Sequence, residues 1–147
     1  MLVTRVEFSV PVVFGKGRPR FARGHAYTPK ETAQKERMVR DSYKLASVRE
    51  YGQVVKAPAG VPVTVEITLY KPLPKSRPLR VLYEFFTVKP DIDNAAKGVL
   101  DGLNSVAYVD DAQVTRLVAV KADRTRDTKE KTVVLVLWED PNGTAEP

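Results

Sequence analysis

The aspartates between residues 89 and 114 are the side chains whose spacing best suits chemistry. Between Asp91 and Asp111 the chain carries five aspartates, one lysine and no glutamate. Carboxylates that converge repel one another unless a cation lies between them, and an all-oxygen ligand set suits a hard ion such as Mg²⁺ or Mn²⁺. Cysteine is absent and His25 is the only histidine. Thiol chemistry and Cys-zinc sites are therefore excluded, and a Ser-His-Asp triad or a His-rich metal site is hard to build.

Local sequence predicts where these carboxylates lie along the chain. Pro90 disfavours helical geometry in the residue before it, so Asp91 is expected at the junction between an extended segment and a helix. Asp93 is then expected at the helix N-cap or in the first turn, where simple capping is the alternative role. Asp110 and Asp111 follow a short apolar run at residues 106–109. If that run returns beside the helix start, three or four carboxylates converge.

Lys97 lies four residues after Asp93 and four before Asp101, so the three share one helix face. This spacing fits a surface ion pair, and it equally fits a cation that stabilises charge on a phosphoryl oxygen during transfer. The spacing leaves both open. Asp101 lies two turns from the expected helix start, and we predict a structural role for it.

A calcium-binding loop is the competing metal site for the same segment. In DIDNAAKGVLDG, Ala96 occupies the position of the sharp-turn glycine, and Gly102 occupies that of the bidentate glutamate. The segment is therefore not an EF-hand loop.

Charge is distributed unevenly along the chain. The formal net charge is +6 and the isoelectric point about 9.6, but residues 1–90 carry a net +10 and residues 91–147 a net −4. A basic surface next to a patch of aspartates is what a nucleic-acid enzyme that uses divalent cations needs; the alternative is a solvated basic face. The cations expected to contact DNA phosphates lie in and near two Gly- and Pro-rich loops: Lys16, Arg18, Arg20, Arg23, Lys75, Arg77, Arg80 and Lys89.

Periodicity and turn residues predict a single α/β (α+β) domain over residues 1–140, with a loose tail at 141–147. Strands are expected at 6–14, 61–70, 83–86, 114–122 and 132–138, the first near a sheet edge because it contains Pro11. A helix is expected from a capping box at residues 28–31 to about Tyr51, and a second from about Asp93. These elements form a mixed sheet with two main helices. The longest apolar run is six residues, and the N-terminus lacks a cleavage site for secretion, so we expect a cytoplasmic protein without a membrane span.

The motif DIDN at 91–94 with Lys97, followed by VDDAQ at 109–113, resembles the central motif of the RusA family of Holliday-junction resolvases. GRPRF at 17–21 and YTP at 27–29 resemble that family's N-terminal block, so the similarity covers most of residues 10–122. The resemblance implies a Mg²⁺-dependent homodimer of bacterial or phage origin that acts on branched DNA. It also implies roles for individual residues: metal-binding catalytic carboxylates at Asp91, Asp93 and Asp111 and a catalytic lysine at Lys97. Asp110, next to Asp111, is our own candidate for an alternative ligand or for a residue that contacts a ligand.

The sequence and the resemblance together predict an endodeoxyribonuclease that resolves Holliday junctions by symmetric paired nicks in DNA recombination and repair. Two equivalent strands need two active sites, which a two-fold homodimer supplies. We expect its interface at apolar strand edges or around Phe85 and Phe86. The alternatives are a metal-dependent nuclease without junction preference and a non-catalytic nucleic-acid-binding module in which the aspartates are structural.

Overall fold

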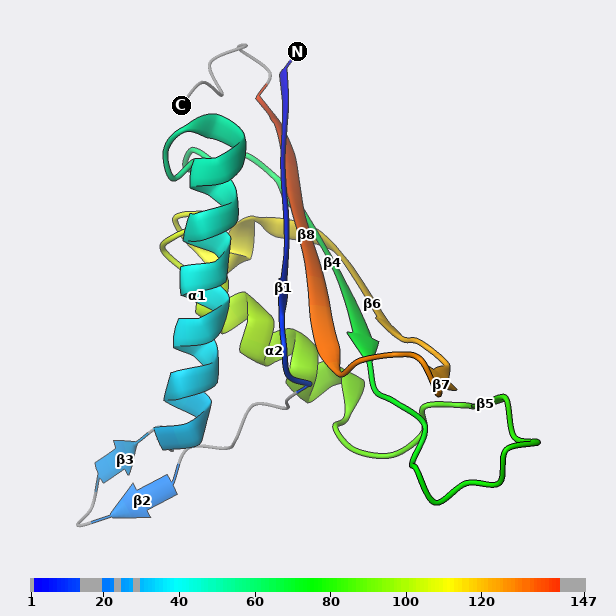
Figure 1. Cartoon of the computed structure of the whole chain (residues 1–147). Helices are drawn as coiled ribbons and strands as arrows, with labels where there is room; N and C mark the ends of the chain where they lie inside the picture. Colours follow the sequence, from blue (N-terminus) through cyan, green and yellow to red (C-terminus); the bar gives the residue numbers. More distant parts are fainter. Residues whose placement is uncertain (1, 14–19, 23–24, 28–29, 141–147) are drawn as a thin grey trace.

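The computed structural model describes residues 2–13, 20–22, 25–27 and 30–140, and its centre is a four-stranded mixed sheet (Figure 1). The strand order is β1-β8-β4-β6, in which β4 pairs parallel to β6 and the other neighbours are antiparallel. Two short two-stranded pairings, β2-β3 and β5-β7, lie outside this sheet. The elements are β1 (Leu2–Val10), β2 (Arg20–Ala22), β3 (His25–Tyr27), α1 (Lys30–Tyr51), β4 (Val63–Tyr70), β5 (Tyr83–Glu84), α2 (Ile92–Leu103), the 3₁₀ turn η1 (Asp111–Gln113), β6 (Val114–Lys121), β7 (Arg124–Thr125) and β8 (Lys131–Asp140).

Both helices pack on the same face of the sheet (Figure 1). Alternate residues of β1, β4 and β8 are buried on this face, as a period of two requires. Val39 and Tyr43 of α1 and Val99 and Leu103 of α2 complete the same core, fully buried. The predicted mixed sheet with two main helices is confirmed.

The contact between α1 and α2 depends on Gly102. A Cβ atom at this position would lie 2.8 Å from Cβ of Val39 and 2.9 Å from the carbonyl oxygen of Glu36. A glycine in a helix costs roughly 1 kcal/mol relative to alanine, but here it lets the two backbones approach. The small buried residues Ala95 and Ala96 line the same helix. The short side chains of α2 are therefore a packing requirement.

Element boundaries depart from the prediction at several places. The first strand runs from Leu2 to Val10 and ends before Pro11, whose missing N–H cannot continue the ladder; its edge position is confirmed. The strand expected at 83–86 contains only Tyr83 and Glu84 in β5. β7 and the pairing of β2 with β3 were not predicted. The capping box at 28–31 begins outside the described residues, and the tail at 141–147 also lies outside them.

In the described part of the chain, no helix has the length and apolar composition needed to cross a membrane.

We predict that Gly102→Ala lowers the free energy of unfolding by about 1–3 kcal/mol, because the new methyl group overpacks the helix crossing. The gain in helix propensity is too small to offset contacts below 3 Å with a backbone oxygen and a Cβ. Urea denaturation measures the effect. Lys44→Ala, at an exposed position on α1, is the control and should stay within about 0.5 kcal/mol; an unchanged midpoint for Gly102→Ala would contradict the packing argument.

Candidate functional site

The start of α2 presents its acidic side chains to solvent. Asp91 is the N-cap residue, and its carbonyl oxygen accepts a hydrogen bond from the Ala95 amide at 3.1 Å. Its carboxylate forms no capping hydrogen bond and instead lies 3.0 Å from Nζ of Lys89. Asp93 in the first turn and Lys97 one turn later are also exposed. Two carboxylates and one cation thus remain accessible at the positive end of the helix dipole.

Lys121, the last residue of β6, holds the chain just before Asp91. Its ammonium group donates hydrogen bonds to the carbonyl oxygens of Val88 (2.7 Å) and Pro90 (2.9 Å). It also lies 4.4 Å from the ring centroid of Phe86, which is buried, in cation–π geometry. The backbone that leads into α2 is therefore fixed to the sheet by one side chain.

Gln113 holds the turn that carries Asp110 and Asp111. Its Oε1 accepts hydrogen bonds from the amides of Val109 (2.9 Å) and Asp110 (3.1 Å). Its Nε2 donates to the carbonyl oxygens of two residues in the loop before β4, at 2.8 and 3.0 Å, namely Pro58 and Val61. All four hydrogen-bonding positions of the amide are used, so η1 is held against that loop with both aspartates exposed.

Tyr108 places this turn beside the second half of α2. The side chain is buried, and its hydroxyl donates to the carbonyl oxygen of Leu100 at 2.8 Å. Burial raises the pKa of Tyr108 well above its usual range, and the charges of Asp111, Asp101 and Asp110 raise it further. The phenol therefore stays protonated and remains a hydrogen-bond donor.

The start of α2 and the turn before β6, which carry the two pairs of aspartates, lie toward opposite ends of β6 (Figure 1). Asp91 follows Pro90, which is bonded to Lys121 at the end of the strand, whereas Asp111 opens η1, which directly precedes Val114 at its start. An eight-residue strand spans about 23 Å between its first and last Cα atoms. Within the described residues, no group of three or more acidic or histidine side chains lies close enough to hold a metal ion.

The sequence predicts that three or four of the carboxylates converge only if residues 106–109 return beside the start of α2. The structure does not meet this condition. The amides of Val106 and Ala107 both bond to the carbonyl oxygen of Leu103, so the chain turns back immediately at the end of α2. The run at 106–109 consequently returns beside the end of the helix and not beside its start.

A smaller ligand set remains at the start of α2. Mg²⁺ is commonly bound by one or two carboxylates together with water and substrate phosphates. Asp91 and Asp93 offer oxygen atoms only, are exposed, and lie two residues apart. Their donor chemistry fits an ion of this kind, to which water or a substrate phosphate would supply further oxygens.

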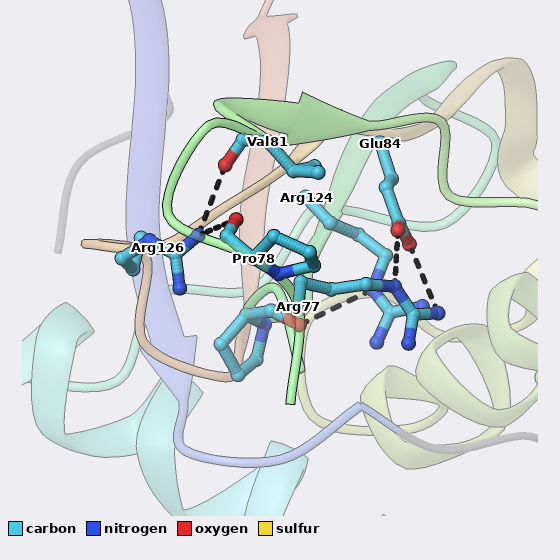
Figure 2. A network of polar contacts seen from close by, with 7 residues as sticks. Arg77, Pro78, Val81, Glu84, Arg124 and Arg126 are labelled. Carbon is cyan, nitrogen blue, oxygen red and sulfur yellow. Dashed lines mark hydrogen bonds and ion pairs between the residues drawn. The ribbon is translucent and has the colours of Figure 1, made fainter. Parts of the chain in front are cut away.

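Residues 71–88, here called the arm, are fixed by guanidinium groups to the chain segment that connects β6 and β8 (Figure 2). Arg124 donates to the carbonyl oxygen of Pro72 at 3.2 Å, and Arg126 donates to those of Pro78 and Val81 at 3.0 Å each. A backbone bond from Leu73 to Thr125 and the β5-β7 pairing complete the attachment.

The predicted DNA-contacting cations of the arm differ in their surroundings. Arg77 is bonded to Glu84 (Figure 2), so much of its charge is compensated. Lys75 and Arg80 are exposed, and neither forms an ion pair with a residue that the structure describes. Lys89 is paired with Asp91. Lys16, Arg18 and Arg23 lie outside the described residues, and Arg20 opens β2, where only the backbone is described.

Comparison with known proteins identifies the family. The family model described as endodeoxyribonuclease RusA matches residues 11–136. The chain belongs to the RusA family of endodeoxyribonucleases. It is also similar to the uncharacterized protein YqaN of Bacillus subtilis (strain 168), with 37% identity over an alignment of 76 residues; the match covers 41% of this chain and 48% of YqaN. The match thus spans about half the length of that curated relative.

The RusA match supports endodeoxyribonuclease activity, and nucleases of this family generally depend on a divalent metal. Sequence reasoning missed three residues that hold the arm and the segment before α2: Lys121, Arg124 and Arg126. The only signal was the alternation of cations in KADRTR at 121–126, which is equally typical of a solvated loop. Their carbonyl partners are up to 52 residues away along the chain, so no local pattern shows them.

We predict that Gln113 is required to order the Asp110–Asp111 turn of this RusA-family chain. Gln113→Leu should increase hydrogen exchange at the amides of Val109 and Asp110 about tenfold or more, because both lose their acceptor. Gln113→Glu keeps the acceptor but loses the donor, so it should protect both amides while the 58–61 loop loosens. Equal exchange in both variants would show that the side chain does not hold the turn.

Proposed function

We propose that this RusA-family protein is a divalent-metal-dependent endonuclease that resolves four-way DNA junctions by paired nicks. The observation that carries the proposal is the family match over residues 11–136, which includes the exposed Asp91 and Asp93 at the start of α2. The cationic arm leads directly into this helix. A role in DNA recombination and repair, in a bacterial or phage cytoplasm, follows from the same proposal.

Asp91 and Asp93 would hold a Mg²⁺ or Mn²⁺ ion. When bound, that ion supplies an activated water for attack on a phosphodiester and neutralises the leaving oxygen. The free amides at the start of α2 favour the phosphate, since the helix dipole is positive there. Lys97 is exposed one turn along the same helix and forms no ion pair with another described residue. It is the cation available to stabilise charge on the phosphoryl oxygens.

Asp111 and Asp110 are proposed as further ligands because of the motif that they share with the family. They join Asp91 at one ion only if η1 approaches the start of α2. This gives Asp111 a test of its own, separate from that of the first pair.

The DNA track of this proposal begins with the exposed cations of the arm. Lys75 and Arg80 are available to bind phosphates. Lys89, whose side chain is 84% exposed, forms an ion pair with Asp91. Once a metal ion binds the Asp91 carboxylate, Lys89 can bind a DNA phosphate in its place. Arg77 and the loop cations Lys16, Arg18, Arg20 and Arg23 are proposed to extend the track. Contacts of this kind position the duplex arms without reading sequence.

A labelled four-way junction and a linear duplex of the same sequence, each with and without Mg²⁺, test the proposal. We expect symmetric nicks in the junction only, and only with the metal. Cleavage of both substrates at similar rates would favour the nuclease without junction preference. Binding of both without any cleavage would favour the non-catalytic module.

We predict that Asp91→Asn and Asp93→Asn each reduce nicking at least 100-fold while junction binding persists or tightens, because the lost negative charge no longer repels phosphate. Single-turnover cleavage and a binding titration measure the two effects. Lys97→Ala should also lose more rate than binding. Asp123→Asn, at an exposed acidic position outside the motif, is the control and should nick at the wild-type rate.

Asp111→Asn distinguishes one shared ion from two separate acidic pairs. If Asp111 is a ligand, the variant loses nicking like Asp91→Asn and part of the rate returns at higher Mg²⁺. Wild-type nicking by Asp111→Asn would remove it from the metal site, and wild-type nicking by Asp91→Asn and Asp93→Asn would overturn the site altogether.

We predict that junction binding weakens steeply with salt and that Lys75→Ala with Arg80→Ala lowers the log-log slope by about 2 units, since two phosphate contacts are lost. Arg77→Ala should change the slope by less, because Glu84 already compensates that charge. Lys44→Ala with Lys56→Ala is the matched control, at two exposed positions outside the arm and the two Gly- and Pro-rich loops. An unchanged slope in the arm variant would take these cations out of the interface.

A further inference from the structure

The arm carries the most exposed large hydrophobic side chains in the described part of the chain. Leu79, Leu82 and Phe85 are 83%, 77% and 69% exposed, and Val3 comes next at 57%. Tyr83 is also exposed, and it and Phe85 are the exposed aromatic residues of the described ranges. Figure 1 shows the segment between β4 and β5 projecting away from the sheet and the helices. Exposed apolar side chains gathered in this way are typical of a surface that meets a ligand.

The backbone beneath these side chains is fixed. Leu79 and Arg80 are the two central residues of a turn that the amide of Val81 closes on the carbonyl oxygen of Pro78 at 3.0 Å. The carbonyl oxygens of Pro78 and Val81 both accept from Arg126 (Figure 2). The tip of the arm is therefore a held turn that presents an apolar side chain next to a cation.

The aromatic residues of the arm are held in the same way. Tyr83 pairs with Thr125 between β5 and β7, and its ring lies 6.0 Å from that of Phe85, centroid to centroid, in edge-to-face geometry. The next residue, Phe86, is buried beneath Lys121. Of the Phe85–Phe86 pair expected at an interface, only Phe85 is therefore accessible. A backbone that is ordered before binding loses little freedom when a ligand binds.

The arm is also cationic. Residues 71–88 contain four cations and one anion, Glu84, which Arg77 already compensates. Lys75 and Arg80 are exposed, and Arg80 adjoins Leu79 in the tip turn. Free cations beside accessible aromatic and apolar side chains suit nucleic acid with unstacked bases, because the cations bind phosphates while the rings stack on base faces.

The exposed aromatic residues lie close to the carboxylates at the start of α2. Phe85 precedes Asp91 by six residues, so their Cα atoms are at most about 22 Å apart. At about 3.4 Å per nucleotide along one strand, this distance spans roughly six nucleotides. Lys121 fixes the backbone between them through the carbonyl oxygens of Val88 and Pro90. The arm therefore reaches bases close to any phosphate bound at Asp91.

We propose that Leu79, Leu82 and Phe85 contact base faces at the centre of branched DNA, and that this contact makes the protein prefer branched DNA to a continuous duplex. In a continuous duplex, stacking covers the base faces, and opening a step costs free energy. At a branch point the strands change partners, so base faces become accessible at lower cost. The inference rests on the proposed function in taking DNA as the substrate, and it adds the feature of the substrate that is recognised.

Binding affinities for a four-way junction and for a linear duplex of the same sequence test this inference. They are measured at 0.15 M salt in EDTA, so that no strand is cut. We expect Leu82→Ala with Phe85→Ala to weaken junction binding about tenfold or more and duplex binding less than about twofold. Leu45→Ala with Val48→Ala, at two exposed apolar positions on α1, is the matched control and should leave both affinities unchanged.

The cations of the arm give the opposite pattern. Lys75→Ala with Arg80→Ala should weaken binding of the junction and of the duplex by similar factors, because both substrates contain the phosphates that these side chains contact. Circular dichroism verifies that each variant is folded.

A fluorescent variant tests the contact without removing it. Phe85→Trp keeps an aromatic surface and should keep the preference for the junction. Because Trp138 is the only native tryptophan and is buried, a change in emission reports on position 85. We expect the junction to quench this emission by base stacking and the duplex to leave it unchanged. Leu45→Trp, on α1, is the control and should respond to neither DNA.

The outcomes separate this inference from the proposed function. A wild type that binds both DNAs equally, an arm variant with unchanged junction preference, or equal quenching by both DNAs would overturn the role of the arm. So would an arm variant that loses only self-association or binding to vesicles with one quarter phosphatidylserine, since the arm would then meet a protein or a membrane. Loss of junction preference in the arm variant, with a wild type that cleaves nothing in Mg²⁺, would overturn the nuclease proposal and leave the arm inference standing.

Discussion

The close crossing of α1 and α2 at Gly102 is the constraint on which the rest of the structure depends. Because Val39 and the backbone of Glu36 leave no room for a side chain there, the axis of α2 is fixed over the sheet. This axis directs the start of α2, with its two aspartates, toward the last residues of β6. It also leaves both described helices on one face of the sheet.

The same crossing lets α1 order the segments around it. The hydroxyl of Tyr43 donates to the carbonyl oxygen of Val55 at 2.6 Å, and Ser47 accepts the amide of Val55 at 2.7 Å. At the end of α1, the hydroxyl of Tyr51 accepts a hydrogen bond from the backbone amide of Arg5 at 2.9 Å. It thus occupies part of the edge of β1 that pairs with no other strand. A protected edge is less prone to add strands from other chains.

Cations in this protein have two distinct uses. The proline-rich arm has few backbone hydrogen bonds of its own, so its carbonyl oxygens need other donors. Lys121, Arg124 and Arg126 supply these donors. The arm is thereby held next to the start of α2. These three cations should therefore not be counted among the charges available to bind DNA. Lys75 and Arg80 stay exposed. The net charge of a nucleic-acid enzyme therefore overstates the charge available to its substrate.

Sequence alone determined the features that depend on neighbours along the chain. The alternation of apolar and polar residues predicted which face of β4 is buried. Pro90 indicated that Asp91 lies at the start of a helix. The spacing of the aspartates in the motif indicated the family. Tertiary structure decided what depends on distant partners: the separation of Asp91 from Asp111, the need for glycine at residue 102, and the carbonyl contacts of Lys121. The physical reason is that periodicity encodes which side of an element is apolar, whereas the distance between two elements depends on packing that no single segment contains.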